Sequence, residues 1–219
     1  MQKQEEVFKK FTKDFLTRAD IYGVLLMGSV AANCASENSD LDIMVLCNEN
    51  KFEVKYIDNV MVEIIYTTYE RRLEKLNESS MEVYHFLQSK IEYDNGYFAE
   101  LIKIANNKYE NYVPTADYIK TVTHWLESTR LKLSSAINQM NGMNRTFYAS
   151  TNVWKVLEGI WMVNRKPMPP SASVLRFHKE LSKKPCENWF EKLFTGNGVD
   201  AFFLLEIIDW ILLEVSILY

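Results

Sequence analysis

The chain has 219 residues, enough for one large domain or two smaller ones, and its apolar (47%) and charged (25%) fractions are ordinary for a globular protein. The formal net charge of −4 argues against a long nucleic-acid partner, which requires a broad basic surface, but not against a nucleotide. Three cysteines without a CxxC pair favour reduced thiols and a cytoplasmic protein, and three dispersed histidines argue against zinc.

The first half of the chain alternates helical and strand patterns. Apolar residues at helical or alternating spacing define the helices and strands, and Asp58-Asn59 supplies the turn of a hairpin. In chain order we predict a helix at 4–19, a strand at 21–27, a short helix at 30–33, strands at 41–46, 52–57 and 60–67, a helix at 69–87, a strand at 90–93 and a helix at 98–106.

The second half shows only helical periodicity. We predict helices at 118–140, 144–164, 172–181 and 199–219, with a firm break at the proline-rich segment 166–170. The fold class is therefore α+β, with a mixed sheet and flanking helices in residues 1–112 and an all-α helical bundle in residues 113–219. Four acids interrupt the apolar run at 199–219, which argues against a membrane span. A bundle helix and a homodimer contact explain that run equally well.

The first element with chemical meaning is Gly28-Ser29. A strand that ends in Gly-Ser and leads into a helix presents backbone N–H groups and a hydroxyl, which are suitable ligands for phosphate oxygens. Taken alone, the dipeptide is more typical of an ordinary tight turn.

The second element is Asp40-Leu41-Asp42. Residues two apart in a strand project from the same face, so Asp40 and Asp42 lie together while Leu41 and Ile43 point into a core. Two adjacent carboxylates repel each other unless a cation lies between them, and Mg²⁺ prefers such oxygen ligands. The alternative is a pair of solvated acids at a strand edge.

A third acid, Glu63, lies in a strand whose other residues are large and apolar. A carboxylate there is costly to desolvate without a cation or a hydrogen-bond partner. If this strand lies beside the Asp40–Asp42 strand, the three acids form a site for one or two Mg²⁺ ions. The alternative is an ion pair with Lys55 across the hairpin.

Gly28-Ser29, Asp40-Leu41-Asp42 and Glu63, in this order and at this spacing, resemble the nucleotidyltransferase superfamily typified by DNA polymerase beta. The helical second half is similar in architecture to bacterial aminoglycoside and lincosamide nucleotidyltransferases. The resemblance implies Mg²⁺-dependent transfer of a nucleoside monophosphate from an NTP, with ATP the first candidate, to a hydroxyl of a small molecule such as an antibiotic. It also implies that Asp40, Asp42 and Glu63 act as metal ligands and catalytic residues and that Gly28 and Ser29 contact the triphosphate.

The sequence departs from that pattern in the second half. Adenylyltransferases of the streptomycin type tend to place a phosphate-binding lysine near the loop before such a short helix, but here that loop, residues 169–173, reads Pro-Pro-Ser-Ala-Ser. The absence of this lysine leaves other cations as candidates to neutralise the triphosphate: Lys155, Arg165, Lys166 and Arg176. Glu127 and Glu158 are candidate general bases, although the sequence favours a solvated helix face for each of them.

The main competing function is a nucleotide-binding regulatory or antitoxin-like protein with little or no turnover. Antitoxins of this type are usually a single short domain paired with a separate helical ribonuclease. The helical half is fused here and lacks an Arg followed four to six residues later by His. The sequence therefore favours an enzyme.

Overall fold

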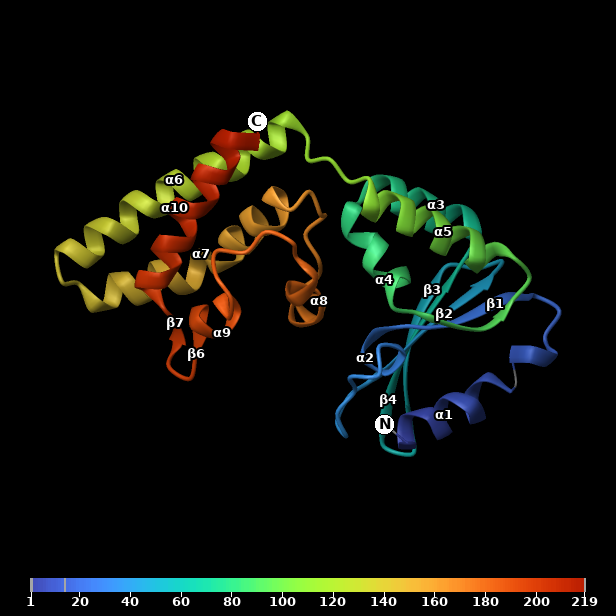
Figure 1. Cartoon of the computed structure of the whole chain (residues 1–219). Coiled ribbons are helices and arrows are strands. Elements are labelled where there is room, and N and C mark those ends of the chain that lie inside the picture. Colours follow the sequence, from blue (N-terminus) through green and yellow to red (C-terminus); the bar gives the residue numbers. More distant parts are fainter. Residues whose placement is uncertain (1, 14, 219) are drawn as a thin grey trace. The chain divides into compact units, whose positions relative to one another are not determined.

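The structure, a computed structural model, describes residues 2–13 and 15–218. The chain divides into two compact units, Met1–Glu110 and Asn111–Tyr219, and each is described by itself (Figure 1). The predicted α+β class is confirmed, because a mixed sheet with flanking helices is followed by a helical region.

The first unit is built on a five-stranded sheet with the order β3-β4-β2-β1-β5. β2 and β4 pair in parallel, whereas the other neighbours pair in antiparallel fashion. The strands are β1 (Ile21–Leu26), β2 (Leu41–Cys47), β3 (Lys51–Ile57), β4 (Val60–Thr67) and β5 (Lys90–Asp94). The hairpin turn between β3 and β4 falls on Asp58 and Asn59, as predicted, with φ of 49° and 60°.

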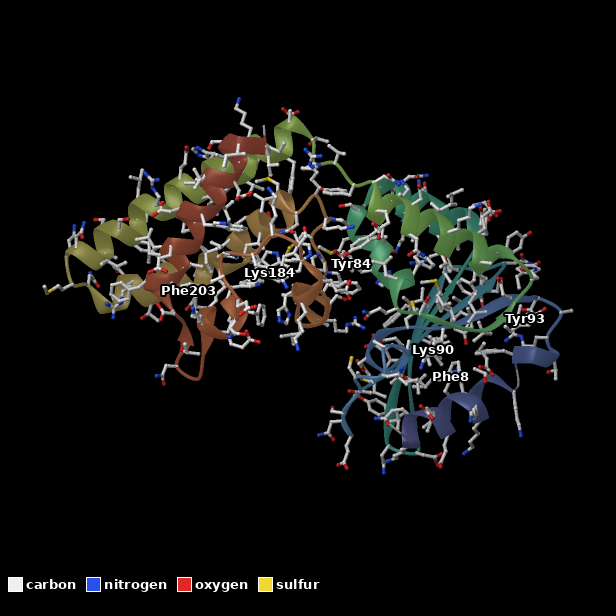
Figure 2. The ribbon with its side chains drawn as sticks, viewed as in Figure 1. Phe8, Tyr84, Lys90, Tyr93, Lys184 and Phe203 are labelled. Carbon is white, nitrogen blue, oxygen red and sulfur yellow. The ribbon has the colours of Figure 1, made fainter. Side chains whose placement is uncertain are left out.

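Helices cover both faces of this sheet. α1 (Gln2–Thr12) packs against one face, and its buried Phe8 lies between the helix and the strands (Figure 2). α3 (Tyr69–Glu78) and α5 (Tyr97–Glu110) lie on the other face (Figure 1). The close approach of α5 to the sheet depends on Gly23 of β1, where an added Cβ would lie 2.6 Å from the ring of Phe98 on α5. Two-sided coverage explains why β1 and β2 read as continuous apolar runs.

Two predicted helices of the first unit are shorter than expected. The helix predicted at 4–19 ends at Thr12 and is followed by a 3₁₀ turn at Phe15–Thr17. The helix predicted at 69–87 is interrupted at Ser79, whose extended backbone (φ −136°, ψ 120°) separates α3 from a 3₁₀ turn at Ser80–Val83 and from α4 (Tyr84–Leu87). Apolar spacing continued through both interruptions, so periodicity alone did not reveal them.

The second unit is a helical bundle in which α6 (Ala116–Asn138), α7 (Gly142–Val163) and α10 (Ala201–Leu218) pack against one another. Fully buried apolar side chains from all three helices form its core: Leu126, Ile160, Trp161, Leu204 and Ile208. α10 is thus a bundle helix, and no helix in the described part of the chain has the length and apolarity to cross a membrane.

The prediction that this half is entirely helical was wrong in one detail. A two-stranded hairpin, β6 (Phe194–Thr195) with β7 (Gly198–Val199), follows a short helix α9 (Trp189–Leu193) that was also not predicted. The helix predicted at 172–181 forms as α8 (Ser171–Phe177) with a 3₁₀ turn at His178–Glu180. Strands of two residues and a helix of five are too short to show periodicity.

Candidate metal and nucleotide site

The turn after β1 brings the chain backbone against an acidic side chain. The Met27 N–H donates to the Asp42 carbonyl oxygen at 2.9 Å, and Gly28 then adopts φ +67° at the start of α2 (Gly28–Ala31). A Cβ built on Gly28 would lie 1.9 Å from Oδ2 of Asp42. Both the left-handed backbone and the missing space require glycine at this position.

Strand register then brings the three predicted acids together. Asp42 of β2 is the register partner of Glu63 on the parallel neighbour β4, and Asp40 directly precedes β2. One carboxylate oxygen of each residue lies within 4.8 Å of those of the other two, and all three side chains are half-buried. Leu41 and Ile43, by contrast, are fully buried on the opposite face, as the alternation predicted.

This acidic cluster, Asp40, Asp42 and Glu63, concentrates carboxylates from two neighbouring strands at one point of the sheet. Among the described residues, neither Asp40 nor Glu63 takes part in an ion pair within 4.0 Å. The alternative partner for Glu63 is engaged elsewhere, because the Lys55 ammonium bonds Glu53 at 3.0 Å and Lys55 is in register with Val62. Three close carboxylates repel one another, so the cluster favours a bound cation, and its oxygen ligands match those of Mg²⁺.

Ser29 adds a hydroxyl group beside this cluster. Its Oγ atom is buried and has no hydrogen-bond partner among the described residues. A buried hydroxyl without a partner costs free energy, and a phosphate oxygen would satisfy it. Together with the backbone of the Gly28 turn, Ser29 therefore fits the predicted triphosphate contact.

The loop that leads into Asp40 is held by a residue that the sequence analysis missed. Gln4 of α1 is only 1% exposed, and its side-chain amide donates to the carbonyl oxygens of Ser36, Glu37 and Ser39 at 3.0, 3.2 and 3.3 Å. A polar residue three positions before Val7 on the apolar face of the helix was the available signal. Gln4 thus positions the segment between Ser29 and Asp40.

The remaining candidates all belong to the second unit and show no comparable cluster. Lys155 is bound to Glu158 at 2.8 Å, and Arg176 donates to the Ser173 hydroxyl at 2.8 Å. Glu127 is exposed, as expected for a residue on a solvated helix face. The predicted roles of the four cations and of the two glutamates remain predictions.

The geometry agrees with a family assignment made on sequence. Residues 7–112 match the family described as "Nucleotidyltransferase domain", which is just under half of the 219 residues. By this match, residues 7–112 are similar to nucleotidyltransferase domains. This domain contains β1–β5 and every member of the acidic cluster, so the recognition of the superfamily from Gly28-Ser29, Asp40-Leu41-Asp42 and Glu63 is confirmed.

Solved structures similar to the whole chain include two proteins with nucleotidyltransferase names. One is a nucleotidyltransferase-like protein from Exiguobacterium sibiricum, with 11% identity, coverage of 97% of this chain and 73% of that chain, and a TM-score of 0.41. The other is spectinomycin adenyltransferase AAD(9) from Enterococcus faecialis with ATP and spectinomycin, with 14% identity, coverage of 99% of both chains and a TM-score of 0.34. No curated protein matches the chain.

Proposed function

We propose that the protein transfers a nucleoside monophosphate from an NTP, with ATP the first candidate, to a hydroxyl of a small molecule, and that it requires one or two Mg²⁺ ions. The observation that carries the proposal is the acidic cluster, in which one carboxylate oxygen of each residue lies within 4.8 Å of the other two and against which the Gly28 turn packs. The proposal assigns this chemistry to the predicted domain 1–112.

In this proposal Asp40, Asp42 and Glu63 hold the metal and act as the catalytic residues. Mg²⁺ held by these three carboxylates would supply charge neutralisation for the triphosphate and would lower the pKa of a coordinated hydroxyl. The protein's own contribution is positional, because the β2–β4 register fixes Asp42 beside Glu63 and the Gly28 turn packs against Asp42. Gly28 and Ser29 bind the triphosphate through backbone N–H groups and the buried hydroxyl.

An antibiotic is one acceptor class consistent with this reaction. The neighbour named spectinomycin adenyltransferase was solved with ATP and spectinomycin, which motivates including that antibiotic in an acceptor panel. A homodimer formed through α10 is an open prediction, since exposed apolar side chains such as Leu213 (59%) remain on that helix.

The first test is Asp42→Asn. We expect the wild-type protein to release pyrophosphate from an NTP with Mg²⁺ and a hydroxylated acceptor, and we expect the variant to fall to background. The metal-free variant should be as stable as the wild type or slightly more stable, because the substitution relieves carboxylate repulsion. Pyrophosphate release and thermal unfolding without metal are the measurements.

The matched control is Asp20→Asn, which removes an exposed carboxylate from the same unit and should retain full activity. If Asp42→Asn lowers the metal-free melting temperature markedly, the cluster is structural. If the wild type binds NTP yet releases no pyrophosphate across a broad panel, the regulatory or antitoxin-like function replaces the enzyme.

A further inference from the structure

A cavity of about 350 Å³ lies in the first unit, between the β3–β4 hairpin and the start of α3. It is not part of the acidic cluster or of the Gly28 turn. Four of its described lining residues are cationic and none is acidic. The lining residues are Asn50, Lys51, Phe52, Ile65, Tyr66, Arg71, Arg72 and Lys75.

Helix α3 supplies most of this positive charge. Arg71 and Lys75 are four residues apart and Arg72 and Lys75 are three apart, so each pair shares a side of the helix. Lys51 contributes less, because its ammonium already bonds Glu53 at 2.5 Å. The cavity, here called the α3 cation pocket, is therefore defined by Arg71, Arg72 and Lys75.

The two arginines are partly but not fully used by protein acids. The side chain of Arg72 is 5% exposed, and its Nε donates to the Thr67 hydroxyl at 3.1 Å. Its Nη1 lies 3.4 Å from Oε2 of Glu82. Arg71 pairs with Glu74, and Glu78 lies 3.7 Å away. A guanidinium carries five N–H donors, so these contacts leave capacity for another anion. A buried guanidinium such as that of Arg72 also gains most from a close anion.

The pocket and the acidic cluster open onto the same face of the sheet. In the β3–β4 register Phe52 pairs with Ile65, and Val54 pairs with Glu63. Directly paired residues share a face, so the Phe52–Ile65 pair that lines the pocket follows Glu63 along β4 by two residues, or roughly 7 Å. Phe52 (59% exposed) and Val54 (45% exposed) form an apolar strip between them.

We propose that the α3 cation pocket binds an anionic group, a carboxylate or phosphate, of the hydroxylated acceptor, whose apolar body lies on the Phe52–Val54 strip. This inference rests on the proposed transferase function and names its acceptor class: an anionic molecule with an apolar or aromatic body, as opposed to a polycationic aminoglycoside. The free donors of Arg71, Arg72 and Lys75 complement an anionic group of the first class and offer no hydrogen-bond acceptor to the ammonium groups of the second.

Binding of two probes of matched size and opposite charge tests the inference without metal, NTP or turnover. The probes are 4-hydroxybenzoate and 4-hydroxybenzylamine, titrated into the full chain and followed by amide chemical shifts. We expect millimolar binding of the benzoate with shifts at Arg71, Arg72 and Lys75, and no saturable binding of the amine. The double variant Arg71→Gln/Lys75→Gln should weaken benzoate binding by about 10-fold or more, as expected for loss of charge-assisted hydrogen bonds.

The control variant Lys103→Gln/Lys132→Gln removes the same charge from two exposed positions and should bind the benzoate like the wild type. Equal or tighter binding of the amine, absence of benzoate binding, or retained affinity in the Arg71/Lys75 variant would each overturn the inference. Benzoate binding without pyrophosphate release in any assay contradicts only the proposed function. If the protein transfers the nucleotide to a cationic acceptor, and the Arg71→Gln/Lys75→Gln variant does so at the same rate, only the pocket assignment is contradicted.

Discussion

The acidic cluster of the sheet unit differs from the ion-paired acids that occur in both units. In the helical unit, three acids lie beside cations: Glu158 binds Lys155, Glu214 binds Lys183 at 2.6 Å, and Asp209 lies 3.3 Å from Arg130. In the sheet unit, three acids are brought within 4.8 Å of one another, and two of them lack any ion pair within the described residues.

The difference follows from the elements that carry the side chains. A helix offers positions three residues apart for opposite charges, and Lys155–Glu158 is such a pair. A parallel strand pair places residues from distant parts of the sequence side by side, so Asp42 and Glu63 meet whether or not their charges agree. Repulsion between neighbouring carboxylates is typical of functional sites, whereas ion-paired charges are typical of structural positions.

The largest expected effect is that of Gly28→Ala on activity. The new Cβ would overlap Oδ2 of Asp42, at 1.9 Å, and φ +67° is unfavourable for alanine. We expect pyrophosphate release to fall to background, with a stability loss of about 1–3 kcal/mol from backbone strain. Steady-state kinetics and denaturant unfolding measure the two effects.

Gly96→Ala is the control that distinguishes the effect of backbone strain from the effect of displacing the Asp42 carboxylate. Gly96 also has a positive φ, +112°, but an added Cβ would meet nothing within 4 Å. This control should lose stability and keep its activity at permissive temperature. If both variants lose activity in proportion to stability, the Gly28–Asp42 contact has no special role.

The second largest effect is expected for a substitution that creates a cavity in the helical unit, and it should change stability but not activity. Leu204 is fully buried, so Leu204→Ala is expected to cost about 2–5 kcal/mol of unfolding free energy. The control Leu213→Ala, at a 59% exposed position of the same helix, should stay within about 0.5 kcal/mol of the wild type. If the folded Leu204→Ala protein loses metal affinity, metal binding is not a property of the sheet unit alone.

The smallest effect is expected for Gln4→Ala. Removal of the amide takes one donor from the carbonyl oxygens of Ser36, Glu37 and Ser39, of which Ser36 keeps the Ser39 N–H, and should cost about 1–3 kcal/mol. Hydrogen exchange of residues 36–39 should accelerate, and activity should fall without disappearing. Glu5→Ala, at an exposed position on the same helix, is the control, and equal exchange rates in the two variants would exclude a positioning role for Gln4.

Much of the sheet unit was predictable because its signals are local. The hairpin turn at Asp58-Asn59 and the alternation of Leu41, Asp42 and Ile43 are properties of adjacent residues, and the structure agrees with both. The break at Ser79 was not predictable, because apolar spacing runs through it. The α3 cation pocket was missed for a different reason: its residues come from a hairpin and a helix, and each cation alone looks like a solvated surface charge.

The sequence by itself determined the types and order of the chemical groups, a Gly-Ser turn followed by Asp-x-Asp and a lone Glu in an apolar strand, because these depend only on local pattern. It also indicated that Asp40 and Asp42 project from the same strand face, opposite Leu41 and Ile43. Only the tertiary structure decided that β4 lies parallel to β2 with Glu63 in register with Asp42, that Lys55 bonds Glu53 and not Glu63, and that Gln4 holds the loop before Asp40. Strand pairing and long-range hydrogen bonds join residues far apart in the chain, and no local pattern specifies their partners.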